Sequence, residues 1–543
     1  MTRNIYDRAA IVDENFTEFC RGWDRRPSRP IAPAERVRGD APLTGAELLD
    51  LFDSQVTSRH LDFESRKMRA RDESFYTIGS SGHEGNAVVG LLTRPTDPAF
   101  LHYRSGGFMV QRAKQDPAVD IVHDTLLGLA ASREDPVAGG RHKVWGSRPL
   151  WVVPQTSTIA SHLPKAVGTA IAIRRTVKIG VEPPIPRDSL VVCSFGDASL
   201  NHSTALGAFS AAARAVYQQV ACPILFVCED NGLGISVRTP PGWVEDAFRH
   251  RPGLKYFQAD GLDLVDAHRV TREAIEVCRG QRRPVFLHLK VARLLGHAGT
   301  DVELEYRSLD EVEATEALDP LLRSAERILK AGLLDATEVL ARYEAIRERV
   351  RSEAARVASR PRLETAADVM RPLAPYSPDA VAAEACRIPD RALRIERFGG
   401  EDRLPEHARP RHMAAQINAA LHDLMLSHPE TVLFGEDVAQ KGGVYHVTTG
   451  LLKAFGAPRV FNTILDETSI LGIAQGFGYM GLLPLPEIQY LAYFHNACDQ
   501  IRGEACSTQF FSADQFRNPM VLRIASLGYQ TVSYTHLTLP TIC

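Results

Sequence analysis

A carboxylate and an amide follow two short apolar runs of the sequence, at the points where two strands would end. The run 190–195 leads directly into Gly196 and Asp197, and the run 223–228 is followed three residues later by Asn231. Both runs have the length and composition of buried strands. The carboxyl ends of parallel strands meet at one edge of a sheet, so these side chains would lie close together and offer the hard oxygen ligands that Mg²⁺ prefers. Gly196 would let a phosphate approach the backbone closely.

The two dipeptides also have a simpler interpretation. Gly-Asp and Asn-Gly are common in turns, and either one alone would indicate the end of a strand and nothing more. Their spacing on successive strands favours instead a joint site for a metal ion and a diphosphate, where the N-termini of helices add positive charge.

The elements around these residues predict an α/β fold. An Ala-rich helical pattern at 202–217 separates the two runs, and a third apolar run covers 284–291. Strand, helix and strand in this order are typical of a parallel sheet with right-handed crossovers. We expect two modules, each a parallel sheet covered by helices. The first covers 43–372, and the second covers 411–530, with helices at 413–427 and 468–480 and strands at 431–434, 486–491 and 520–525.

The remaining segments differ from these modules in composition. Residues 1–42 are polar and rich in Arg and Pro, which indicates a loosely held arm. Residues 373–410 mix Pro, Ala, Arg and Glu without sustained periodicity, as linkers do. Residues 531–543 continue no pattern and are interpreted as a non-native tail.

The composition limits the class of protein. The 543 residues are 44% hydrophobic and 24% charged, which is ordinary for a soluble protein of two or three domains. The formal net charge of −3 gives no global basic field for nucleic acid or a membrane surface. The nine cysteines form no CxxC motif, and no apolar stretch is long enough for a membrane span. We therefore expect a cytoplasmic enzyme that binds neither nucleic acid nor membrane.

The block GDASLNHSTALGAFSAA, followed by CEDNGLGIS, resembles the thiamine-diphosphate motif of 2-oxoacid dehydrogenase α subunits, especially the branched-chain type. The resemblance implies that Asp197 and Asn231 bind Mg²⁺ through their side chains and Leu233 through its backbone carbonyl. It also places Gly196 and Ser199 against the cofactor.

Other segments of the first module resemble the same family. HYRSGGFMVQR implies cofactor contacts by Tyr103 and by Arg104, whose fork of donors suits phosphate oxygens. TSTIASHLPKAVGTA implies contacts by Ser157 and Ile159, although its small residues also suit plain helix packing. In GHAGTD, the resemblance implies that His297 helps to handle the 2-oxoacid, with a surface histidine as the alternative.

Two further positions of the first module raise questions. The family often has a diphosphate-binding arginine where this chain has Glu229. A carboxylate beside a diphosphate is repulsive, so Glu229 must turn away, pair with a cation or weaken binding. His142, in GGRHKVWG, is a weaker candidate that could simply be exposed.

The segment that begins FGEDVAQKGG and continues to EIQYLAY resembles the β subunit of this family. The resemblance implies that Glu467 is the catalytic carboxylate that activates the aminopyrimidine ring of the cofactor. Leu465 would contact the cofactor through its backbone, Tyr493 would stack on the ring, Gln489 would lie near the substrate and Glu436 would be a supporting carboxylate. Without the resemblance, Glu467 would be a helix N-terminal acid and Tyr493 a core residue.

One motif in this segment is misleading. Residues 476–481 match GxGxxG, the dinucleotide fingerprint, but they follow helical sequence where the fingerprint requires a strand. Small residues that permit close helix packing explain these glycines better, and we expect no nicotinamide to bind.

The resemblance as a whole implies a fused α/β 2-oxoacid dehydrogenase that uses thiamine diphosphate and Mg²⁺. It would decarboxylate a 2-oxoacid oxidatively, with branched-chain acids favoured, and pass the acyl group to the lipoyl group of an acyltransferase core. Pairing of modules between chains would require a homodimer or larger assembly. Pyruvate or acetoin as substrates and ketol transfer of the transketolase type are the alternatives. The family's β subunit continues beyond the matching segment, so a further alternative is that the chain is a truncated and inactive fragment.

Overall fold

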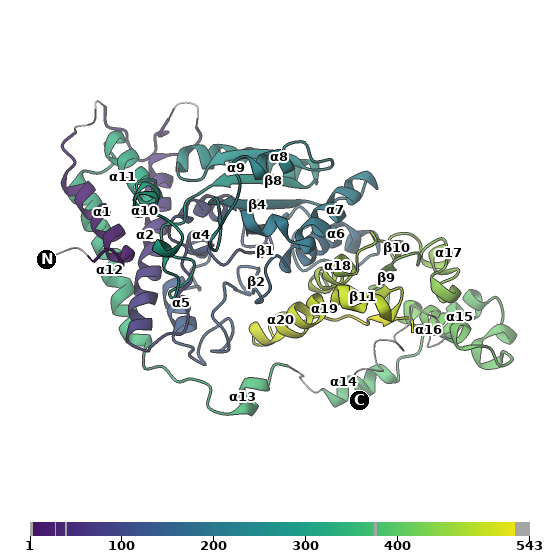
Figure 1. Cartoon of the computed structure of the whole chain (residues 1–543). Coiled ribbons are helices and arrows are strands. Elements are labelled where there is room, and N and C mark those ends of the chain that lie inside the picture. Colours follow the sequence, from purple (N-terminus) through teal and green to yellow (C-terminus); the bar gives the residue numbers. More distant parts are fainter. Residues whose placement is uncertain (1–3, 26, 28, 39–40, 374–376, 527–543) are drawn as a thin grey trace.

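The computed structural model describes residues 4–25, 27, 29–38, 41–373 and 377–526, so the expected tail at 531–543 lies outside the described residues. The described residues form two α/β modules that lie side by side (Figure 1). Among these residues, no helix combines the length and the apolar character that crossing a membrane requires.

The first module is built on a six-stranded sheet in which all neighbouring strands are parallel. In sheet order the strands are β2 (Val152–Val153), β1 (Ala99–Phe100), β3 (Val191–Gly196), β4 (Ile224–Asp230), β8 (Val285–Lys290) and β7 (Lys255–Asp260). The three strands predicted from the sequence are β3, β4 and β8, which confirms the parallel arrangement. Gly196 is in register with Glu229, so β3 and β4 end at the same edge.

Helices cover both faces of this sheet. Alternate residues of β3 contribute to opposite hydrophobic clusters, as the two-residue period of a buried strand requires. One cluster contains α6 (His162–Lys178) and α7 (Ser203–Tyr217), and the other contains α4 (Gly106–Ala113) and α9 (Leu264–Gln281). The predicted helix at 202–217 is α7.

The N-terminal segment is not a loosely held arm. Residues 8–21 form α1 (Arg8–Arg21), which packs against α11 (Pro320–Ala331) and α12 (Ala336–Val357). Phe16 is fully buried, and its ring stacks on Tyr343 at a centroid distance of 4.3 Å. The Arg- and Pro-rich composition of residues 21–42 hid the apolar face of α1. Helices α1, α11 and α12, together with α2 (Gly45–Ala70), form a helical layer beside the sheet (Figure 1).

The segment between the modules contains short helices rather than irregular chain alone. They are α13 (Ala366–Met370), α14 (Pro378–Ala385) and α15 (Arg391–Phe398), and none of them has a buried residue. Figure 1 shows this connection running along the lower edge of the molecule, away from the six-stranded sheet.

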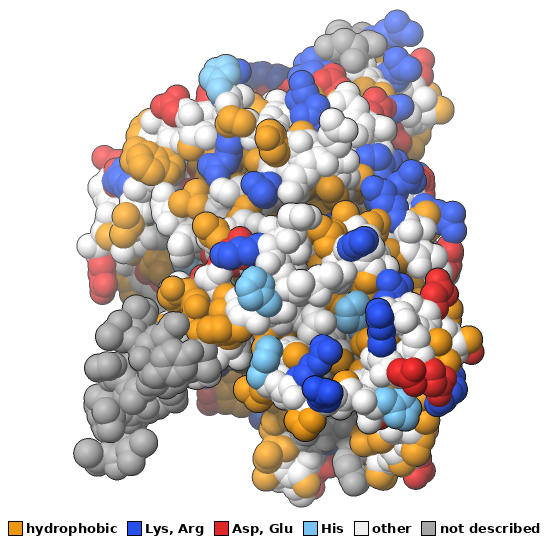
Figure 2. Space-filling view, turned by 90° about the vertical axis from the view of Figure 1, so that its right-hand side faces the viewer, with side chains coloured by type: hydrophobic (Ala, Val, Ile, Leu, Met, Phe, Trp, Pro, Cys, Tyr) orange, Lys and Arg blue, Asp and Glu red, His pale blue; other side chains and the backbone are white. Residues whose placement is uncertain are grey.

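The second module has a four-stranded parallel sheet. In sheet order its strands are β10 (Val460–Asn462), β9 (Thr431–Gly435), β11 (Leu483–Ile488) and β12 (Arg523–Ile524), and its helices include α16 (Met413–Ser427) and α18 (Glu467–Tyr479). Basic, acidic and hydrophobic side chains are interspersed on the face of the molecule at this end (Figure 2).

Strand β11 begins three residues before the predicted start because two prolines obscured it. The Leu483 N–H donates to the carbonyl of Glu430, on the β9 side of the strand. Pro484 and Pro486 alternate with such donors and face the other side, where β12 pairs only with Glu487 and Ile488. Their missing N–H groups therefore remove no ladder hydrogen bond.

The two modules meet where α6 crosses α18. A Cβ added to Gly476 would lie 2.3 Å from the Lys165 carbonyl oxygen, and one added to Gly168 would lie 2.4 Å from the Ile473 carbonyl oxygen. Only glycine permits this approach of the two backbones. Close helix packing therefore accounts for Gly476 in the GxGxxG segment, and one hydrophobic cluster includes residues of both sheets, such as Phe195 and Phe434.

Candidate functional site

The residues predicted for the first module converge on one cavity of about 570 Å³ at the carboxyl edge of the six-stranded sheet. The lining includes Tyr103, Arg104, Ser157, Ile159, Gly196, Asp197, Ser199, Asn231, Leu233 and His297. All candidate residues of the first module therefore line one cavity, although they come from segments as far apart as residues 103 and 297.

Asp197 is a buried carboxylate that forms no ion pair with any described residue. It accepts hydrogen bonds from the Thr239 hydroxyl and from the Asn231 N–H. Burial is the main cause that raises the pKa of its carboxyl, and the nearby Asp230 raises it further. Such a carboxylate is stabilised by a cation bound beside it.

The loop after β4 carries the other two predicted ligands. The Asn231 Oδ1 accepts a hydrogen bond from the Leu233 N–H at 2.9 Å, across a turn in which Gly232 has a φ of +75°. The chain then forms the hairpin of β5 (Leu233–Gly234) and β6 (Val237–Arg238), which returns Thr239 to Asp197. The carboxylate, the amide oxygen and the local carbonyls are oxygen donors, and this set fits a magnesium ion.

The approach to Gly196 fits a bound diphosphate. A Cβ at this position would come within 3.3 Å of His102 Nε2, so a side chain would fill the space above the end of β3. Arg104 lines the same cavity, and its side chain is buried. Its Nη1 donates to the Gly79 carbonyl at 2.6 Å, which fixes the guanidinium in place.

Glu229 does not face the cavity. Its side chain is fully buried, and its Oε2 lies 2.7 Å from His83 Nδ1 and 3.1 Å from Asn86 Nδ2. The repulsion between this carboxylate and a diphosphate, which the sequence raised as a concern, is avoided because the side chain turns away from the site.

His297 is half-buried and lies against Arg104. The Arg104 Nη2 is 3.2 Å from His297 Nδ1 and donates to the His297 carbonyl at 3.1 Å. Burial first, and then the charge of Arg104, lower the pKa of His297 to about 4. The imidazole is therefore neutral at pH 7. Because Arg104 can only donate, Nδ1 carries the lone pair and Nε2 carries the proton.

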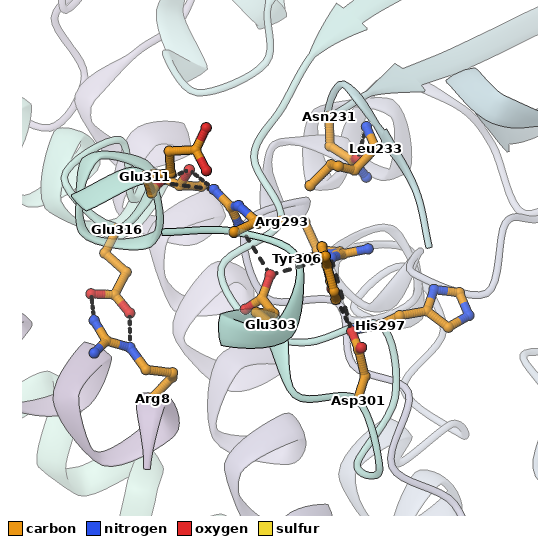
Figure 3. A network of polar contacts seen from close by, with 12 residues as sticks. Arg8, Asn231, Leu233, Arg293, His297, Asp301, Glu303, Tyr306, Glu311 and Glu316 are labelled. Carbon is orange, nitrogen blue, oxygen red and sulfur yellow. Dashed lines mark hydrogen bonds and ion pairs between the residues drawn. The ribbon is translucent and has the colours of Figure 1, made fainter. Parts of the chain in front are cut away.

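A polar network that the sequence did not predict joins the His297 loop to the loop of Asn231 and Leu233 (Figure 3). Asp301 accepts hydrogen bonds from the His297 N–H at 2.6 Å and from the Tyr306 hydroxyl at 2.7 Å. Arg293 donates to Tyr306 at 2.6 Å and to the Ile235 carbonyl, also at 2.6 Å. Arg293 is buried, and its partners lie in two different loops, so no local pattern in the sequence indicated its role.

His142 lines the cavity and is not simply exposed. Its ring lies 4.9 Å from that of Phe511, a residue of the second module, and burial lowers its pKa. The neighbouring Lys143, which sequence analysis missed, also lines the cavity and places its ammonium group 3.6 Å from the ring centroid of Trp145.

The residues predicted for the second module form a separate group. Glu436 and Glu467 are buried and close enough that Glu467, after burial itself, raises the pKa of Glu436 to about 7. Leu465 is 82% exposed, Tyr493 packs edge-on against Tyr490, and Gln489 is partly buried. None of these residues lines the 570 Å³ cavity, so within one chain the structure does not unite the two predicted halves of the site.

Comparison with known proteins assigns the family. A family model described as "Dehydrogenase E1 component" matches residues 53–366, which is more than half of the chain. The chain belongs to this family. A second model, "Transketolase, pyrimidine binding domain", matches residues 410–536. The fused thiamine-diphosphate-dependent 2-oxoacid dehydrogenase organisation expected from the sequence is therefore confirmed at the level of the family.

Individual relatives resemble the two modules separately. The chain is 28% identical over 320 residues to the mitochondrial 2-oxoisovalerate dehydrogenase subunit alpha of Mus musculus, covering 57% of this chain and 66% of the relative. It is 40% identical over 116 residues to the 3-methyl-2-oxobutanoate dehydrogenase subunit beta of Mycobacterium tuberculosis (strain CDC 1551 / Oshkosh), covering 21% of this chain and 33% of the relative. A 2-oxoisovalerate dehydrogenase subunit beta of Pseudomonas aeruginosa is 36% identical over 128 residues, covering 24% of this chain and 37% of the relative. The chain thus spans about a third of the β-type relatives and just under two thirds of the α-type one.

Proposed function

We propose that this protein catalyses the oxidative decarboxylation of a 2-oxoacid with thiamine diphosphate and Mg²⁺, with a lipoyl disulfide as the oxidant that takes up the acyl group. The observation that carries the proposal is the buried Asp197, which has no cationic partner among the described residues and shares a cavity with Asn231 and Arg104. Bound thiamine diphosphate would supply a carbon nucleophile that attacks the 2-oxo group and stabilises the charge left when carbon dioxide departs.

The chain's own residues have distinct tasks in this proposal. Asp197 and the Asn231 Oδ1, with the carbonyl of Leu233, hold the cation, while Arg104 neutralises the diphosphate. Gly196 leaves the space that a phosphate occupies. Tyr103, Ser157, Ile159 and Ser199 line the cavity and would contact the cofactor.

Polar groups of both modules complete the proposed chemistry. Glu467 would bind the aminopyrimidine ring and favour the tautomer in which the cofactor's own nitrogen takes up a proton, with Glu436 close by as support. The neutral His297, whose Nδ1 faces Arg104, would donate a hydrogen bond from Nε2 to the substrate oxygen. Tyr493 and Gln489 would pack beside the ring and the substrate, and the exposed Leu465 would contact the cofactor through its backbone.

The proposed substrate and partners rest on the names of the relatives. These favour a branched-chain substrate such as 3-methyl-2-oxobutanoate, and their description as subunits supports a role within a multienzyme complex that has a lipoyl-bearing acyltransferase core. Because the carboxylates of the second module do not line the cavity of the first, we propose that two copies of the chain pair to complete each site. A cytoplasmic location is part of the proposal, in keeping with five buried cysteines that are not in disulfides.

The test combines calorimetry with product analysis. Thiamine diphosphate should bind in the presence of Mg²⁺ and not in its absence. Asp197→Ala should abolish this Mg²⁺-dependent binding. Glu467→Gln should retain binding but lose at least about a hundredfold in carbon dioxide release. Carbon dioxide release would be compared for 3-methyl-2-oxobutanoate and pyruvate, and acetaldehyde release would be measured for acetoin, each with oxidised lipoamide as the acceptor. Equal and negligible turnover of all three by protein saturated with cofactor would rule the function out.

A further inference from the structure

A cluster of three buried side chains adjoins Asn231, a proposed ligand of the cation. The coordinating atoms of His83, His102 and Glu229 lie within 4.8 Å of one another, so the group could hold a metal ion of its own. However, both ring nitrogens of His83 already have partners, because Nδ1 contacts Glu229 Oε2 at 2.7 Å and Nε2 contacts Asn231 Nδ2 at 3.0 Å. The geometry therefore points to a different task for His83 and Glu229.

The orientation of the Asn231 amide follows from an unambiguous donor. The backbone N–H of Leu233 can only donate, and it lies 2.9 Å from one end of the amide, which must therefore be the oxygen Oδ1. The other end is Nδ2, which can only donate and points to His83 Nε2. Oδ1 retains a second lone pair, and Asn231 lines the cavity.

The tautomer of His83 follows from the same chain of contacts. Because Nδ2 of Asn231 donates to it, Nε2 of His83 must carry a lone pair, and the ring proton must therefore be on Nδ1. Nδ1 then donates to the Glu229 carboxylate. Asn86 Nδ2 donates to the same oxygen at 3.1 Å and holds the carboxylate in place. The side chains of His83, Glu229 and Asn86 are all buried, which strengthens the contacts between them.

We propose that Glu229 and His83 are positioning residues that fix the amide of Asn231 with its oxygen toward the cation. This inference rests on the proposed function, since it concerns the metal site of that function. An amide that is free to turn over would present its NH₂ group to the cation for part of the time, and a donor cannot bind a metal ion. Partners of this kind, one contact removed from a metal, commonly change metal affinity by about 10- to 100-fold.

The test measures Mg²⁺ affinity by calorimetry at saturating thiamine diphosphate. His83→Leu removes both contacts at similar volume and should weaken Mg²⁺ binding about 10- to 100-fold. His83→Gln should keep affinity within a few-fold of the unchanged protein, because its amide can accept from Asn231 and donate to Glu229 at once. Glu229→Leu should weaken Mg²⁺ binding in the same direction as His83→Leu. His268→Leu, at a buried histidine of α9, is the matched control and should change nothing.

The His83→Leu substitution in an Asn231→Asp protein distinguishes loss of the amide orientation from general damage to the fold. In Asn231→Asp protein both side-chain oxygens are acceptors, so a turned-over group still binds the cation, and adding His83→Leu should then cost less than about twofold in Mg²⁺ affinity. Equal losses from His83→Leu with and without the Asn231→Asp change, or unchanged affinity in His83→Leu alone, would overturn the positioning role alone. If the unchanged protein bound no thiamine diphosphate with Mg²⁺, the proposed function and the positioning role would both fall.

Discussion

Glu436 and Glu467 are two carboxylates that share a site with little water. Glu436 is 6% exposed, and its pKa is raised to about 7 by burial and then by Glu467. The folded protein therefore holds a proton on Glu436 at acidities where the unfolded chain has released it. This contribution to stability is fully present below the unfolded value near 4.5 and is lost as the pH rises through about 7. The carboxylate pair should thus destabilise the fold at alkaline pH.

Glu436→Gln should raise the melting temperature by roughly 2–4 °C at pH 8 and by less than about half as much at pH 5.5, since the amide cannot ionise. Thermal unfolding followed by circular dichroism at both pH values would measure the difference. Glu364→Gln, at an exposed position, is the control and should behave alike at both. An equal gain at the two pH values would contradict the ionisation argument.

Helices α6 and α18 are the elements on which the arrangement of the two modules depends. Their glycines let one backbone touch the other, so that the cluster containing Phe195 and Phe434 is continuous across the contact. Gly472 contributes in the same way, since a Cβ there would lie 2.2 Å from Cβ of Pro164. Any side chain inserted here must push the two helices apart.

Gly476→Ala should lower the free energy of unfolding by about 1–3 kcal/mol, because the new methyl group meets backbone atoms that cannot move independently. Gly280→Ala offers a matched comparison: it also lies in a helix, α9, but has no heavy atom within 4 Å of the added Cβ. That variant should be more stable by about 0.5–1 kcal/mol. Denaturant titrations would decide, and a Gly476→Ala protein as stable as the parent would rule out tight packing.

At this scale the sequence predicted the main elements and missed specific ones for physical reasons. The strand ends that carry Asp197 and Asn231 were predictable because apolar runs and turn residues are local signals. Helix α1 was missed because the Arg- and Pro-rich residues that follow it dominate the composition of the N-terminal segment. The start of β11 was missed because prolines are unusual in an interior strand. The contact of His83 with Glu229 spans 146 positions, and no local pattern could reveal it. Nor could the sequence show that Glu467 lies outside the first cavity.

A buried ion pair joins the two modules of the molecule. Lys165 of α6 donates to Glu504 of the second module at 2.5 Å, and both side chains are fully buried. The same carboxylate accepts from Thr156 at 2.7 Å and from Ser161, in the loop that carries Ser157 and Ile159. The second module therefore holds part of the lining of the cavity in the first.

Lys165→Met should lower the free energy of unfolding by about 3–5 kcal/mol, because it leaves the Glu504 charge buried without its partner. The affinity for thiamine diphosphate should fall as well, since the loop of Ser157 loses its anchor. Arg187→Met breaks the exposed pair with Glu182 and should cost less than about 1 kcal/mol. Thermal unfolding and calorimetry would measure both effects, and similar small losses in the two variants would refute the coupling.

The exposed connection between the modules has a consequence for how the protein holds together. Helices α14 and α15 bury no residue, whereas α6 and α18 share a continuous apolar core. A protease that nicks the chain near residue 390 should therefore yield two polypeptides that still co-purify, much as the relatives' α and β chains bear separate subunit names. The peptide linkage would then ensure that the two modules are made in a one-to-one ratio, while the buried apolar contact would hold them together.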